Sequence, residues 1–122
     1  MRLYEVTVTT AADGSATAYA PSSGKCRGLL EAIQYEKIDF ADGVDFTITD
    51  EVTGESLWTD TNINASEVVR PRAAVADQAG AARLYASGGT GVSDKIAIVS
   101  RIKIVIAQGG NAKSGKFRFH IG

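Results

Sequence analysis

Residues 101–122 read RIKIVIAQGGNAKSGKFRFHIG and contain two segments in which apolar and polar side chains alternate. The first, 102–106, is rich in β-branched residues, which favour a pleated strand. The second, 116–121, places two phenylalanines and an isoleucine at every other position. A period of two residues is that of a strand with one buried face. Because a glycine-rich turn separates the two segments, the sequence predicts a C-terminal hairpin over 102–121.

The same alternation recurs toward the N-terminus. An Asp-Gly turn separates the alternating segment 3–10 from 16–20, and this order predicts an N-terminal hairpin. Farther along, 44–50 and 56–61 alternate on either side of a turn that contains Gly54. This second pair is the clearest hairpin signal in the chain.

Residues 25–38 carry two competing patterns. Leu29, Leu30 and Ile33 have helical spacing, whereas Ile33 and Tyr35 alternate with polar residues as in a strand. Gly28 weakens a helix by about 1 kcal/mol relative to alanine, and no good capping residue lies directly upstream. We therefore predict a strand.

Residues 62–93 form the irregular part of the sequence. The residue before Pro71 avoids helical angles, so this region is predicted to be extended. The alanine-rich 73–86 could hold one short helical turn, and the glycine cluster at 88–91 ends it. A connection of this length is unusual in a compact domain, and such segments often carry function or form interfaces.

These elements predict a single domain over 1–122 in the all-β class. Several short strands with regularly spaced turns indicate an antiparallel β-sandwich of about eight strands, jelly-roll-like in strand number. The length of 122 residues fits one domain, and 44% hydrophobic with 22% charged residues is ordinary globular composition.

Composition also excludes several classes of function. Thirteen Lys and Arg against 14 Asp and Glu argue against nucleic-acid binding. No apolar run approaches the ~20 residues of a membrane-spanning helix. Cys26 and His120 are single, which leaves almost no material for a disulfide framework or a zinc site. Glu5 interrupts any signal-peptide core, so synthesis and folding in a cytoplasm are expected.

No motif predicts catalysis or cofactor binding. The loop 109–115 lacks the spacing of a phosphate loop and is interpreted as a turn. The carboxylates Asp39, Asp42 and Asp45 could bind calcium, but solvated turn residues are the favoured interpretation. His120 should face away from its apolar neighbours as a surface or interface histidine. We assign no catalytic residue, no cofactor and no metal.

Exposed residues at loops and strand ends are the candidates for an interaction surface. Leu57 and Trp58 should fall on opposite faces of a strand, so one of them should point outward, as an interface anchor or a sugar-stacking platform. The Arg70-Pro71-Arg72 segment suits an extended arm that contacts an acidic partner. The predicted interface residues are Phe40, Trp58, Val68, Val69, Arg70, Arg72, Arg83 and Tyr85.

Three segments together, 9–19, 39–49 and 101–110, resemble small structural proteins of tailed bacteriophages, of the capsid decoration or cement type. The resemblance implies a β-sandwich or jelly-roll fold and no enzymatic activity. It implies self-association into a homodimer or homotrimer. It also implies binding to the major capsid protein on the outer surface of the shell, after synthesis in the host cytoplasm. Two alternatives stay open: a phage tail or baseplate component, and a carbohydrate-binding β-sandwich that uses Trp58 and neighbouring turn carboxylates.

Overall fold

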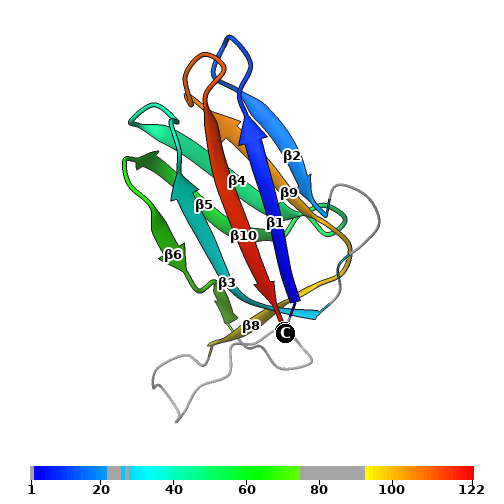
Figure 1. The fold of residues 1–122 in the computed structure, drawn as a ribbon. Coiled ribbons are helices and arrows are strands. Elements are labelled where there is room, and N and C mark those ends of the chain that lie inside the picture. The colour runs from blue at the N-terminus through cyan, green and yellow to red at the C-terminus, as the bar shows by residue number, and fades with distance from the viewer. Residues whose placement is uncertain (1, 22–25, 27, 75–92) are drawn as a thin grey trace.

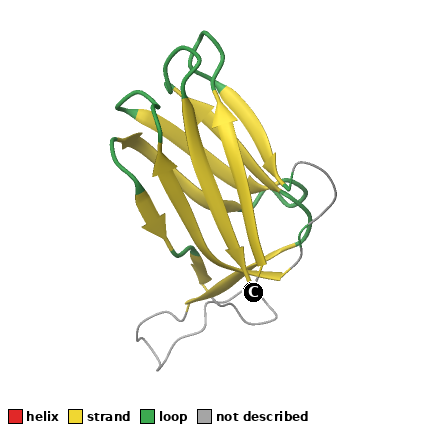
Figure 2. Ribbon diagram, viewed as in Figure 1, coloured by secondary structure: helices red, strands yellow, loops and turns green. Residues whose placement is uncertain are grey.

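The computed structural model describes residues 2–21, 26, 28–74 and 93–122, which form an antiparallel β-sandwich (Figures 1 and 2). The described part of the chain contains ten strands and no helix, and therefore no helix long and apolar enough to span a membrane. The strands are β1 (Arg2–Thr9), β2 (Ala16–Ala20), β3 (Gly28–Lys37), β4 (Val44–Asp50), β5 (Ser56–Ile63), β6 (Glu67–Val69), β7 (Arg72–Ala74), β8 (Ser93–Ile98), β9 (Ile102–Ala107) and β10 (Ser114–Ile121). The predicted all-β sandwich is confirmed, with ten strands instead of about eight.

The strands form two sheets. The larger has the order β1-β10-β3-β8-β7, with β6 also paired to β3, and the smaller has the order β2-β9-β4-β5. Every strand pair is antiparallel. One edge of β3 is shared by two neighbours, because 28–30 pair with β8 and 33–35 pair with β6. The partner of β3 on this edge therefore changes between Leu30 and Ile33.

Two of the predicted hairpins are wrong, and one is confirmed. The β4–β5 hairpin forms as predicted, and 28–37 is a strand. By contrast, β1 pairs with β10 and β2 pairs with β9, so neither terminal segment folds back on its sequence neighbour. Each predicted hairpin is instead an arch that crosses from one sheet to the other. Alternation fixes which face of a strand is buried, but it does not choose the partner strand.

The two arches bind each other at one end of the sandwich (Figure 1). The Thr10 amide donates to the carbonyl of Lys113 at 2.8 Å, and the Lys113 amide donates to the Thr10 hydroxyl at 2.9 Å. The Gly109 amide donates to the Gly14 carbonyl at 2.9 Å. Gly14 has a φ of 84°, and a Cβ atom there would lie 3.2 Å from the Gly109 amide nitrogen. The Asp-Gly turn is thus part of an arch, in which a side chain at Gly14 would contact the backbone of the other arch.

The irregular connection predicted over 62–93 contains more structure than expected. β5 continues to Ile63, and the short strands β6 and β7 follow it before β8 begins at Ser93. The predicted helical turn and glycine cluster fall on 75–92, which lie outside the described residues.

The core between the sheets joins an aromatic cluster to the isoleucines of β9. Tyr35 contacts Phe46 edge-on at 4.7 Å between ring centroids and lies 5.3 Å from Phe117. Trp58 packs edge-on against Phe46 at 5.4 Å. Ile102, Ile104 and Ile106 are fully buried beside these rings.

Candidate functional site

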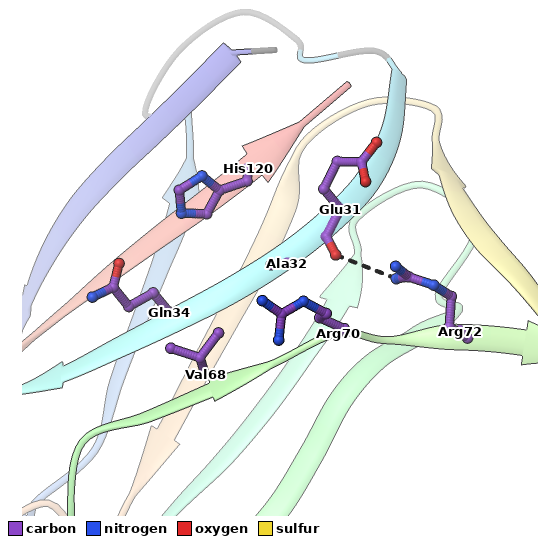
Figure 3. Close-up of a pocket in the computed structure, with 7 residues that line it drawn as sticks. All are labelled: Glu31, Ala32, Gln34, Val68, Arg70, Arg72 and His120. Carbon is purple, nitrogen blue, oxygen red and sulfur yellow. Dashed lines mark hydrogen bonds between the residues drawn. The ribbon is translucent and has the colours of Figure 1, made fainter.

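A shallow groove of about 280 Å³ opens on the larger sheet (Figure 3). Its walls come from β3, β6, β7, β10 and the segment between β6 and β7. The residues that line it are Glu31, Ala32, Gln34, Val68, Arg70, Arg72 and His120.

The groove forms where the hydrogen-bonded ladder of β3 is interrupted on both sides. On one side, Leu30 pairs with β8 and Ile33 pairs with β6, so Glu31 and Ala32 between them have no paired residue on those strands. On the other side, the register with β10 shifts beside His120. Such a bulge bends a strand and re-aims its side chains, and bulges are common next to functional sites.

Arg72 occupies part of this gap. Its guanidinium donates to the carbonyl oxygen of Glu31 at 3.3 Å, shown by the dashed line in Figure 3, and to the carbonyl oxygen of Pro71 at 2.7 Å. These bonds satisfy a β3 carbonyl at the point where the ladder is broken. They also fix the guanidinium in place while leaving its positive charge without a carboxylate partner among the described residues.

Arg70 contributes the second guanidinium of the groove. Its side chain is exposed, and no hydrogen bond or ion pair joins it to another described residue. In Figure 3 it lies between Val68 and Arg72. Val68, which is 50% exposed, adds an apolar surface beside the charge.

The carboxylate in the groove does not neutralise these arginines. Glu31 Oε1 forms an ion pair with Lys95 Nζ at 2.8 Å, so the charge of Glu31 is balanced from β8. Arg70 and Arg72 therefore give the groove a positive charge on a chain whose formal net charge is -1.

The rest of this sheet face has charges that are paired with one another. Arg118 lies 2.7 Å from Glu5 and 3.3 Å from Glu36, and Lys116 lies 3.7 Å from Glu5. The hydrogen bond from Arg118 outweighs partial burial and lowers the pKa of Glu5, while the same bond raises the pKa of Arg118. In contrast to the groove arginines, the charges on this part of the face have partners of opposite sign within the chain.

The groove has the chemistry of an anion-binding surface. A guanidinium can donate two parallel hydrogen bonds to one carboxylate or phosphate, which gives both strength and orientation. Two such groups beside an exposed valine suit an acidic segment that also carries apolar side chains. The open, shallow shape fits a protein surface better than an enclosed small molecule.

The structure places the predicted interface residues in three different settings. Val68, Arg70 and Arg72 line the groove, and Val69 is partly buried against the core. Arg83 and Tyr85 lie outside the described residues.

The prediction that Phe40 is exposed is wrong. Phe40 is 2% exposed, and its ring stacks with Tyr35 at 6.1 Å between centroids. The ring occupies the space beside Gly115, where an added Cβ would clash with it. A glycine on β10 therefore admits a loop residue into the core.

The prediction that Leu57 or Trp58 points outward is also wrong. Leu57 is 5% exposed and Trp58 is 9% exposed. The β4–β5 register pairs Ile48 with Trp58 but Thr49 with Ser56, so Leu57 is the extra residue of a bulge. A bulge breaks the two-residue period, which lets two consecutive side chains face the core.

The sequence did not reveal Glu31, Ala32 and Gln34 as residues that line the groove. The strand pattern in 28–37 could have placed Gln34 on the outer face, but neither the bulge nor the change of neighbour has a sequence signal. His120 is partly buried and faces away from buried Phe119 and Ile121, as expected.

Asp39 and Asp45, two of the turn carboxylates considered for calcium, accept hydrogen bonds from distant parts of the chain. Asp45 accepts from the Asn62 amide at 3.0 Å and from the side chain of Gln108 at 3.2 Å. Asp39 accepts from the Ser114 amide. Across the described ranges, no group of three or more His, Cys, Asp or Glu side chains is placed to hold a metal ion.

Comparisons with known proteins give no family. No protein-family model matches the sequence, and no curated protein sequence matches it. A solved structure titled "Crystal Structure of FLHE" aligns with a TM-score of 0.45 and 8% sequence identity, covering 97% of this chain and 94% of that chain. A likeness this remote does not indicate a function.

Proposed function

We propose that this protein is a structural docking protein of a phage particle, which attaches to the capsid exterior by binding the major capsid protein. The observation that carries the proposal is the groove in which Arg70 and Arg72 lie in the open beside Val68, with no carboxylate partner for either arginine among the described residues. The sequence resemblance to capsid decoration proteins supplies the identity of the assembly. The proposal assigns no catalytic residue and no cofactor.

The chemistry of the groove specifies the partner surface. Guanidinium groups favour carboxylates, so the docked segment should present Asp or Glu side chains toward Arg70 and Arg72. An apolar side chain of the same segment would cover Val68. Charge complementarity of this kind sets orientation and association rate more than affinity.

The fold suits a protein that must keep its shape under load. The two sheets share one hydrophobic core, and the arches that connect them are hydrogen-bonded through Thr10 and Lys113. A rigid scaffold presents its groove with little ordering of the backbone, and many copies on a symmetric shell would combine weak contacts into strong attachment.

Electron microscopy of intact particles tests the proposal directly. Density on the shell should disappear when this protein is absent and return when it is added back. Arg70→Glu should lower shell occupancy, because it places a negative charge against an acidic partner. Lys113→Glu makes the same charge change on an exposed side chain in the arch region, and it should leave occupancy unchanged. Absence of the protein from purified heads, or full occupancy by Arg70→Glu, would overturn the proposal.

Copy number separates this function from the tail or baseplate alternative. A decoration protein is present in hundreds of copies on each particle, whereas a tail-tip component is present in few. The carbohydrate-binding alternative depended on an exposed Trp58, and the buried ring leaves it without its stacking platform.

A further inference from the structure

The outer edge of β1, which faces away from β10, has no paired strand within 2–21, 28–74 and 93–122. β1 runs from Arg2 to Thr9 and pairs along its whole length with β10. None of the other described strands pairs with its opposite side. A strand edge with unpaired amide and carbonyl groups is a template for another strand.

The other sheet edges are short or irregular, whereas β1 is long and regular. β2 has five residues and is followed by Pro21, and β6 and β7 have three residues each. The ladder between β4 and β5 shifts register twice. β1 presents eight residues with no shift against β10 and contains no proline and no lysine. Short strands, bulges, proline and charged side chains are the devices that discourage edge pairing, and of these β1 carries only the charges of Arg2 and Glu5.

Apolar side chains along the same side of the sandwich are incompletely covered. Tyr4 and Val6 on β1, and Ala16 and Ala18 on β2, pack against the core while remaining partly exposed. A strand added to β1 would bring new side chains over this row. The edge therefore offers both backbone hydrogen bonds and apolar contact to the same occupant.

We propose that a second copy of this chain occupies this edge, with the two β1 strands antiparallel and Val6 opposite Val6. A two-fold axis perpendicular to the sheet relates such strands, so each outward residue must face an outward residue. The two registers that overlap most, by seven residues, are centred on Glu5 and on Val6. Centring on Glu5 places two like carboxylates directly opposite, which is destabilising, so the register centred on Val6 is favoured.

The favoured register gives compatible neighbours on both faces. Apolar residues meet on the inner face, and Glu5 meets a neutral hydroxyl on the outer face. The facing pairs are Val6–Val6, Glu5–Thr7, Tyr4–Val8 and Leu3–Thr9.

This arrangement would place both arginine grooves on the same side of one continuous sheet. The groove strand β3 is separated from β1 by β10, so five strand spacings of about 4.8 Å put the two β3 strands about 24 Å apart. The dimer would then be bivalent toward any repetitive acidic surface. The self-pairing itself stands on β1 and does not depend on the docking function.

Substitutions at Thr7 test the pairing and its register together. In the proposed register, each dimer contains two pairs in which Thr7 of one copy faces Glu5 of the other. Thr7→Lys should tighten the dimer by roughly three- to fivefold through two opposite-charge pairs, and Thr7→Glu should weaken it by a similar factor. Sedimentation equilibrium of the full chain over a concentration series measures both dissociation constants.

The same substitutions have opposite effects within one copy. Thr7 is paired with Lys116 of β10, so Thr7→Glu should favour the fold and Thr7→Lys should disfavour it. Urea unfolding of each variant therefore distinguishes a change in folding from a change in association. Thr47→Lys and Thr47→Glu, on an exposed position of β4, are the matched controls and should leave the dissociation constant unchanged.

The proposal is supported if Thr7→Lys lowers the dissociation constant and Thr7→Glu raises it, while both Thr47 variants leave it unchanged. A wild-type chain that stays monomeric at all concentrations would overturn it. So would a dimer whose dissociation constant the Thr7 variants leave unchanged or shift in the same direction. Solution dimers without shell binding would leave this inference intact and overturn only the proposed function.

Discussion

The carboxylate of Asp50 accepts a 2.9 Å hydrogen bond from the amide of Val99, which joins two turns from distant parts of the chain. Asp50 ends β4, and Val99 follows β8. The other oxygen of Asp50 accepts from the amides of Val52 and Thr53 at 3.0 and 3.3 Å and from the Ser100 hydroxyl at 3.3 Å. One fully buried side chain thus organises the β4–β5 and β8–β9 connections.

Replacing this carboxylate should destabilise the fold. Asp50→Asn turns one acceptor into a donor that must face an amide or hydroxyl donor, so we expect a loss of about 1–3 kcal/mol in the free energy of unfolding. Urea denaturation measures the loss. Glu55→Gln changes an exposed carboxylate in the same turn and should stay within about 0.5 kcal/mol of the wild type.

The contribution of Asp50 should depend on pH. Burial by itself raises the pKa of Asp50, but the hydrogen bonds from Val99, Thr53, Val52 and Ser100 outweigh it and hold the pKa below its usual value. A group whose pKa is lowered by folding stabilises the native state above its unfolded pKa, about 3.9, and loses that effect as the pH falls through the folded pKa.

The difference in unfolding free energy between wild type and Asp50→Asn should therefore be largest above about pH 5 and narrow below about pH 4. Denaturation series at several pH values measure it. A difference that stays constant down to pH 2.5 would contradict the role given to the charged form.

The two groove arginines should differ in their contribution to stability. Arg72→Ala removes the hydrogen bond to the Glu31 carbonyl, and we expect a loss of about 0.5–1.5 kcal/mol in unfolding free energy. Arg70→Ala removes no bond to a described residue and should change stability by less than about 0.5 kcal/mol. Equal losses of unfolding free energy for both variants would show that the bond from Arg72 to the Glu31 carbonyl does not stabilise the fold.

Tyr35 carries a buried hydroxyl without a hydrogen-bond partner among the described residues. Burial raises its pKa to about 12. Tyr35→Phe keeps the ring contacts and removes the unsatisfied group, so we expect an unchanged or higher unfolding free energy, by up to about 1 kcal/mol. Tyr19→Phe removes a hydroxyl from a partly exposed position and serves as the comparison. A loss above about 1 kcal/mol in Tyr35→Phe would mean that the hydroxyl is satisfied in solution.

The strands were predictable because their information is local. The alternation in β4, β9 and β10 marks each inner face, and the β4–β5 turn joins strands that are neighbours in both sequence and space. The pairing of β1 with β10 was not predictable, because a two-residue period carries no signal about a strand more than a hundred residues away. The Asp13-Gly14 turn is a hairpin signal by itself, but here it connects strands of two different sheets.

The candidate site was predictable only in part, for the same reason. Arg70 and Arg72 are adjacent to a proline in an extended segment, which marked them as an exposed arm. Their groove also needs Glu31 at a bulge and His120 from β10, a juxtaposition that only tertiary structure creates. The burial of Phe40 and Trp58 likewise follows from Gly115 and from a bulge, and neither alters the local pattern.

The bonded arches also determine how the sandwich would respond to pulling. Arg2 and Ile121 are cross-strand partners at the end of the β1–β10 ladder opposite the arches. Tension between these two residues would peel the ladder one pair at a time, because the hydrogen bonds of antiparallel strands lie perpendicular to them. Thr10 and Lys113, which exchange two hydrogen bonds at the crossings, form the last pair that such peeling would reach. The arches thus form the part of the β1–β10 contact that would open last under this tension.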